Sequence, residues 1–169
     1  MGDSATTIIA IFLAAILMFV FPLMTMADKT DDTVKLTVQT ATTEFTNDIR
    51  STGLLSQQKY DNFILALSST NNSYDAEIVV QKLDENPAKK ASGAYVKIGD
   101  NVYYTMYTTQ VLESLPLQLK EGDIISVTVK NTNNTIATQL RNFMFKVTGN
   151  ESKAITAQSS GIVTKTTTK

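Results

Sequence analysis

The chain has 169 residues, and its 15 Lys and Arg side chains nearly balance its 16 Asp and Glu side chains, which gives a formal net charge of −1. It contains no Cys, His or Trp, which excludes thiol nucleophiles, disulfides, Cys or His zinc sites and His general bases. The basic residues form no cluster, so no nucleic-acid partner is expected.

The first expected element is a membrane-spanning helix. From Thr6 to Ala27 the sequence is apolar or weakly polar and includes the uncharged run IIAIFLAAILMFVFPLM, which meets the roughly 20 residues that a bilayer core requires. The alternative is a cleaved secretory signal with a weak cleavage site at Thr25-Met26-Ala27. We favour the uncleaved helix, because the MGDS start lacks basic residues and the run is longer than a usual signal core.

The charges beside the span do not define its orientation, because Asp3 lies before it and Lys29 follows it among aspartates. Asp28, Asp31 and Asp32 lack the ligand spacing of a calcium loop. We interpret these three aspartates as solvated groups just beyond the membrane surface.

An amphipathic segment is expected to continue this helix. Apolar residues recur with helical spacing at Val34, Val38, Ala41, Phe45 and Ile49. Val34, Leu36 and Val38 also alternate, which leaves a short strand as an alternative. No breaker lies between Ala27 and Gly53, a suitable C′ residue. We therefore predict one helix from Thr6 to Thr52, about 70 Å long at about 1.5 Å per residue.

Short helices and strands are expected after Gly53. SQQKYDNFILALSST predicts an amphipathic helix with Ser56 as its N-cap. Alternating apolar residues predict strands in SYDAEIVVQKL, in GDIISVTVKNTN and from about Ile155 to Val163. DENPAKKASG predicts a polar loop, and AYVKIGDNVYYTMYT predicts two strands around a tight turn at Gly99.

Two further helical segments are expected between these strands. TTQVLESLPLQLKEG predicts a helical turn that ends at Pro116, and NNTIATQLRNFMFKV predicts a short helix that passes into a strand at Phe143 to Val147. The elements together predict an α+β fold: a long N-terminal helix, transmembrane and then amphipathic, with a small antiparallel β-sheet head that carries short helices. The expected domains are residues 1–53, with the span at about 6–27, and the head at 54–169.

No catalytic, cofactor or metal site is predicted. The nucleotide-binding patterns G-x-x-x-x-G-K-[ST] and G-x-G-x-x-G are missing, as is the G-x-S-x-G pattern of serine hydrolases. We therefore expect a protein that is not an enzyme and needs no cofactor. Tyr103, Tyr104 and Tyr107 form an aromatic cluster that fits either a recognition surface or a hairpin with alternate rings in the core. We favour the core interpretation.

The order of these elements resembles the type IV pilin superfamily across the whole chain. More closely, the chain is similar to the TadE-like minor pilins and pseudopilins of tight-adherence and related secretion systems. The stretches that carry the resemblance are GDSATT before the span, DIRSTG at the end of the helix, GDIISVTVK, and LRNFMFKV.

This resemblance implies a structural subunit of an adhesion or secretion filament. Its expected partners are membrane lipid, other pilin-like subunits and the assembly machinery. It implies a single pass through the cytoplasmic membrane with the head outside, and processing between Gly2 and Asp3. Thr7 then stands where such prepilins usually carry Glu, and the leader lacks basic residues. Both departures fit a minor pilin, a pseudopilin or an unprocessed anchor better than a major pilin.

Assembly would use the apolar helix. The small residues Ala10, Ala14 and Ala15 permit close helix approach, and Pro22 predicts a kink that is either harmless or functional. Two alternatives remain open: a single-pass membrane-anchored extracellular binding domain, and a secreted soluble domain released by signal cleavage.

Overall fold

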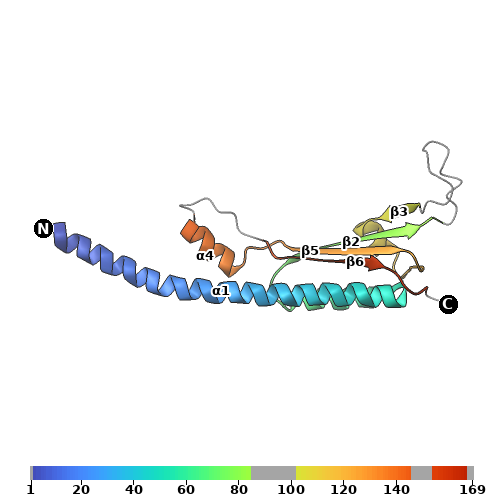
Figure 1. The fold of residues 1–169 in the computed structure, drawn as a ribbon, viewed down its shortest axis with the longest axis horizontal. Helices are drawn as coiled ribbons and strands as arrows, with labels where there is room; N and C mark the ends of the chain where they lie inside the picture. The colour runs from blue at the N-terminus through green and yellow to red at the C-terminus, as the bar shows by residue number, and fades with distance from the viewer. Residues whose placement is uncertain (1, 85–101, 146–153, 167–169) are drawn as a thin grey trace, which may run out of the picture. The chain divides into compact units, whose positions relative to one another are not determined.

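The computed structural model describes residues 2–84, 102–145 and 154–166 (Figure 1). It has the predicted α+β class, with a long apolar N-terminal helix followed by a small antiparallel sheet and short helices. The elements are α1 (Gly2–Thr52), β1 (Leu54–Leu55), α2 (Gln57–Ser68), β2 (Tyr74–Leu83), β3 (Tyr103–Met106), α3 (Thr108–Glu113), β4 (Leu117–Gln118), β5 (Ile124–Asn131), α4 (Ile136–Phe145) and β6 (Thr156–Ile162).

The chain divides into two compact units. The N-terminal unit comprises Met1–Leu36 and Asn134–Ile155, and the sheet unit comprises Thr37–Asn133 and Thr156–Lys169. Helix α1 contributes its first part to the N-terminal unit and its last part to the sheet unit.

Helix α1 confirms the prediction of one continuous helix. It ends at Gly53, whose φ of 67° is the left-handed conformation that glycine adopts readily and whose N–H donates to the Ile49 carbonyl at 2.8 Å. The alternative strand at residues 34–38 is wrong. The segment is helical because the helical spacing of Val38, Phe45 and Ile49 places all three on one side of the helix, where they are buried.

Threonines complete the buried stripe of α1. Thr42 and Thr46 are fully buried, and their hydroxyls donate to the carbonyls of Val38 and Thr42, both at 2.7 Å. Each hydroxyl therefore has a hydrogen-bond partner in its own helix, and the methyl group is left for packing. Thr25 does the same in the apolar segment, where it donates to the Phe21 carbonyl at 3.0 Å.

Helix α2 packs on the last part of α1. Ser56 is its N-cap, as predicted, and accepts a hydrogen bond from the Lys59 N–H at 3.3 Å. The buried Phe63 ring stacks on Phe45 of α1, with 4.3 Å between ring centroids and 5° between ring planes. This stacked pair joins the two helices.

The main sheet has four antiparallel strands in the order β3-β2-β5-β6. Figure 1 shows β2, β5 and β6 side by side. Their register pairs Ile78 with Val127 and Val80 with Ile125, and all four side chains are fully buried. The alternation that predicted β2, β5 and β6 therefore fills the core from one face of the sheet.

Some of the shorter elements differ from the prediction. Strands β1 and β4, two residues each, pair with one another and were not expected. The first arm of the predicted hairpin and its turn at Gly99 lie outside the described residues, while the second arm, β3, pairs with β2. A strand beginning at Phe143 is wrong, because α4 extends to Phe145. The rest of that segment, to Val147, lies outside the described residues.

A side chain at Gly161 of β6 is expected to destabilise the sheet unit. A Cβ atom there would overlap the Cδ, Nε and Cζ atoms of Arg50, whose Nε donates to the Ile162 carbonyl at 3.0 Å. Gly161→Ala should therefore break this hydrogen bond and lower the free energy of unfolding by about 1–2 kcal/mol.

Urea denaturation of the detergent-solubilised chain measures this change. In an Arg50→Ala background the same substitution should cost close to nothing, because the obstructing side chain is gone. An equal cost in both backgrounds would contradict the proposed overlap.

Candidate functional site

The first part of α1 exposes an apolar surface. Between Ser4 and Met26 its large apolar side chains are exposed, apart from the half-buried Val20 and Met24, and most of the exposed ones by more than half; they include Ile8, Ile9, Ile11, Phe12, Leu13, Met18, Phe19, Phe21 and Leu23. Within the described residues, this is the one helix long and apolar enough to cross a membrane, and its most apolar window is not buried in the protein. An apolar surface of this extent is stable in contact with lipid or with other protein surfaces, and unfavourable in contact with water.

The small residues predicted for helix packing lie on this surface. Ala10, Ala14 and Ala15 are exposed, and Ala10 and Ala14 are one helical turn apart. Pro22 is also exposed, and α1 continues through it. Gly2 and Asp3, the candidate processing residues, are the first residues of α1, and their side chains lie outside the described part.

Two of the three aspartates beyond the apolar segment have protein partners. Asp28 forms an ion pair with Arg141 of α4 at 2.5 Å, and Asp31 accepts a hydrogen bond from the Thr135 hydroxyl at 2.7 Å. The interpretation of the cluster as purely solvated is therefore wrong for these two residues. Asp32 is exposed, and the described residues include no group of three or more His, Cys, Asp or Glu that could hold a metal ion.

The predicted tyrosine cluster is distributed over β3 and the start of α3. Tyr104 is 42% exposed and Tyr107 59% exposed, whereas Tyr103 is half-buried and its hydroxyl lies 3.4 Å from the Gly122 carbonyl, to which it donates. None of these three rings is buried, so the interpretation as core rings is wrong. The exposed rings of Tyr104 and Tyr107 leave the recognition surface as a hypothesis.

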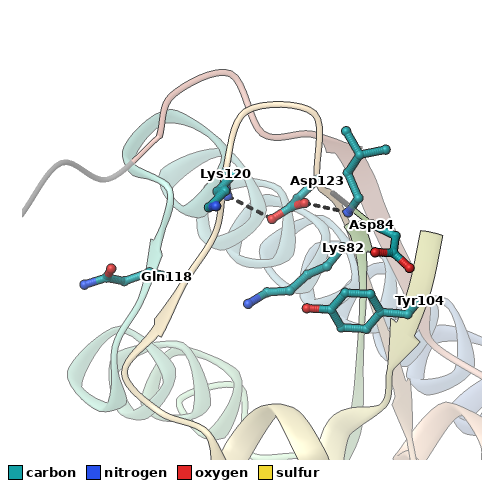
Figure 2. Close-up of a pocket in the computed structure, with 7 residues that line it drawn as sticks. Lys82, Asp84, Tyr104, Gln118, Lys120 and Asp123 are labelled. Atoms are coloured by element: carbon teal, nitrogen blue, oxygen red, sulfur yellow. Dashed lines mark hydrogen bonds between the residues drawn. The ribbon is translucent and has the colours of Figure 1, made fainter. Parts of the chain in front are cut away.

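A polar hollow of about 390 Å³ lies beside Tyr104, and the sequence did not predict it. Its lining comes from β2, β3, β4 and the turn before β5: Lys82, Leu83, Asp84, Tyr104, Gln118, Lys120 and Asp123. Figure 2 shows the Lys82 side chain and the Tyr104 hydroxyl pointing into it. Lys82 and Gln118 bring an ammonium group and an amide, which can donate hydrogen bonds to a polar group, and Asp84 brings a carboxylate, which can accept them.

Asp123 shapes this hollow and is 3% exposed. Its two carboxylate oxygens accept from the N–H groups of Lys120 at 2.8 Å and Leu83 at 2.9 Å, as Figure 2 shows. It therefore ties the end of β2 to the turn before β5. Asp123 directly follows Gly122, whose φ is 97°, and Gly and Asp are both residues that favour turns.

Ser56 and Lys59 have the S-x-x-K spacing of some serine hydrolases. The Lys59 ammonium instead pairs with Asp48 at 2.8 Å and donates to the Thr52 hydroxyl at 2.7 Å. Ser56 caps α2, so the two side chains have structural partners and do not form a nucleophile and base pair.

No family model, curated protein or solved structure was found to match the chain. The exposed apolar part of α1 and the polar hollow are therefore the two features from which a function can be argued.

Proposed function

We propose that the chain is a structural pilin-like subunit, a minor pilin or pseudopilin of an adhesion or secretion filament. The apolar part of α1 holds the subunit in the cytoplasmic membrane, with the head outside. On assembly, the same surface leaves the lipid and packs against the helices of other pilin-like subunits, with the assembly machinery acting on the membrane-bound form.

One observation carries this proposal: α1 is a single helix with two different surroundings. Its first part exposes apolar side chains, and its last part supplies Val38, Phe45 and Ile49 to the core of the sheet unit. A plain membrane anchor requires no helical continuation into the core of the domain that it holds. A subunit that assembles through its anchor requires this continuation, because the packing of its anchor helix against other subunits must also position the domain that it displays.

The small residues supply the packing chemistry. In lipid there is little hydrophobic drive for helices to associate, so association depends on close van der Waals contact, which small side chains allow. Ala10 and Ala14 form a small patch among the exposed isoleucine, leucine and phenylalanine side chains of α1. This patch is the proposed contact between subunits.

The experiment uses the absence of cysteine from the chain. An Ala14→Cys variant should form disulfide-linked dimers on oxidation of the native membranes. A Leu65→Cys variant, at a residue of α2 that is 68% exposed, should not. N-terminal sequencing of the mature protein accompanies the test. A start at Asp3 supports the proposal, whereas a start at Asp28 would mean a cleaved signal and a secreted domain.

A second candidate function is a membrane-tethered binding domain. The polar hollow beside Tyr104 favours it, because Lys82 and Gln118 bring hydrogen-bond donors to one place. The same experiment separates the two functions: membrane-bound protein that retains residues 4–27 but shows no cross-link through Ala14→Cys supports the tethered domain.

A further inference from the structure

Helix α4 is held to α1 where the apolar segment ends. From Ser4 to Ala27 the chain carries no charge, and Asp28 is the first charged residue after that run. The Arg141 guanidinium of α4 pairs with Asp28, and Thr135, the residue before α4, donates to Asp31. Both contacts lie within the N-terminal unit.

The two contacts define the direction of α4 along α1. The partner of Thr135 is Asp31, and the partner of Arg141 is Asp28, three residues nearer the apolar segment. Asp31 lies about 4.5 Å beyond Asp28 along the axis of α1, whereas Thr135 and Arg141 are about 9 Å apart along a helix axis. Helix α4 is therefore steeply inclined to α1, and its Arg141 end is the one nearer the apolar segment.

Helix α4 presents three different faces. Ala137 and Thr138 are buried and, with Arg141, form the face toward α1. Gln139 and Asn142 are exposed and polar. Ile136 is 72% exposed and lies one turn before the half-buried Leu140, so the described residues of the chain cover a third, apolar face only in part.

We propose that α4 is an interfacial helix that lies on the surface of the membrane crossed by α1, with the face of Ile136 and Leu140 against the lipid. The inference rests on the membrane span of the proposed function. The interfacial layer is about 5–8 Å thick on each side of the hydrocarbon core. The contacts at Asp28 and Asp31 fall within that distance of Ala27.

Lipid is the occupant because of this position. An apolar helix face fixed to the last turn of a membrane span meets the headgroup and acyl boundary before it meets any other apolar surface, and helices with one apolar and one polar face bind there. The Asp28–Arg141 ion pair then fixes the depth of α1, because α4 resists being drawn into the hydrocarbon core.

The experiment uses the absence of tryptophan from the chain. The full chain carrying Ile136→Trp is reconstituted into phosphatidylcholine vesicles, and the matched control carries Asn142→Trp, at an exposed polar residue on another side of the same helix. Ile136 is largely exposed, so the larger ring needs no repacking. Trp fluorescence of the first variant should shift to shorter wavelength and lose most of its intensity when the lipid is replaced by phosphatidylcholine brominated near the headgroup. The control should emit as in water.

A second variant tests the link to α1. Adding Asp28→Asn and Arg141→Gln to Ile136→Trp removes the ion pair and should reduce the quenching by brominated lipid. Unchanged quenching in this triple variant overturns the role of the ion pair in positioning α4.

Flotation of the vesicles separates failure of this inference from failure of the span. Protein that floats with the vesicles but shows equal, water-like emission for Ile136→Trp and Asn142→Trp overturns the interfacial helix and leaves the span intact. Protein that does not float overturns the span, and the interfacial helix with it.

Discussion

Replacing Ala14 with phenylalanine is expected to abolish assembly of the chain while its insertion into the membrane and the fold of its sheet unit remain unchanged. Ala14 is exposed on α1 and contributes nothing to the core. A phenyl ring raises the apolarity of the span, so insertion is preserved. It also keeps neighbouring helices apart by the width of a ring, which removes the close van der Waals contact on which association in lipid depends.

The measurement is the amount of high-molecular-weight species after chemical cross-linking of native membranes. Ile9→Phe is the matched control, because Ile9 is 65% exposed on a different side of α1 and is already large. We expect Ile9→Phe to assemble as the wild-type chain does. Normal assembly of Ala14→Phe would reduce α1 to an anchor and favour the tethered binding domain.

Replacing Phe63 with alanine is expected to lower the free energy of unfolding by about 3–5 kcal/mol. Phe63 is 4% exposed and stacks on Phe45 at 4.3 Å, so its removal leaves a cavity between α2 and α1 that their backbones cannot close. A loss of this size is a large share of the roughly 5–15 kcal/mol that holds a small domain together. The variant should therefore be close to unfolding at physiological temperature.

Thermal denaturation followed by circular dichroism measures this loss. Leu65→Ala is a control in the same helix, since Leu65 is 68% exposed and its truncation should change the free energy of unfolding by less than about 0.5 kcal/mol. Equal melting temperatures for Phe63→Ala and the wild-type chain would contradict the packing of α2 on α1.

The sequence predicted the elements whose apolar residues repeat over many positions. The stripe from Val34 to Ile49 predicted the end of α1, and the alternation Ile125, Val127, Val129 predicted β5. These predictions are correct because one face of each element is buried, so apolar residues recur along the sequence with the period of the helix or strand. Gly53 and Ser56 marked the boundary between α1 and α2 for a local reason, since each satisfies the backbone at a helix end.

The remaining features depend on contacts between distant residues. The last turn of α4 contains Phe143 and Phe145, whose type favours a strand, but the backbone there continues the helix that begins at Ile136. The partners of Asp28 and Asp31 lie more than one hundred positions away in the sequence. No local pattern identifies such pairs.

The polar hollow was beyond sequence-based prediction for the same reason. Lys82, Tyr104 and Gln118 come from three different strands, and Asp123 holds the turn that brings the lining together. Each of these residues is unremarkable in its own segment. The tyrosines could be recognised as a cluster, but their exposure depends on what the neighbouring strands cover.

The threonines of α1 make this helix largely independent of its surroundings. Thr25, Thr42 and Thr46 each give their hydroxyl proton to a carbonyl one turn earlier in the same helix. A hydroxyl left without a partner in hydrocarbon or in a protein core would cost several kcal/mol, roughly 2–7 depending on the reference state. Because these hydroxyls carry acceptors for their protons with them, α1 can be placed in water, in lipid or in a protein interface without leaving a hydroxyl donor unpaired at these three positions.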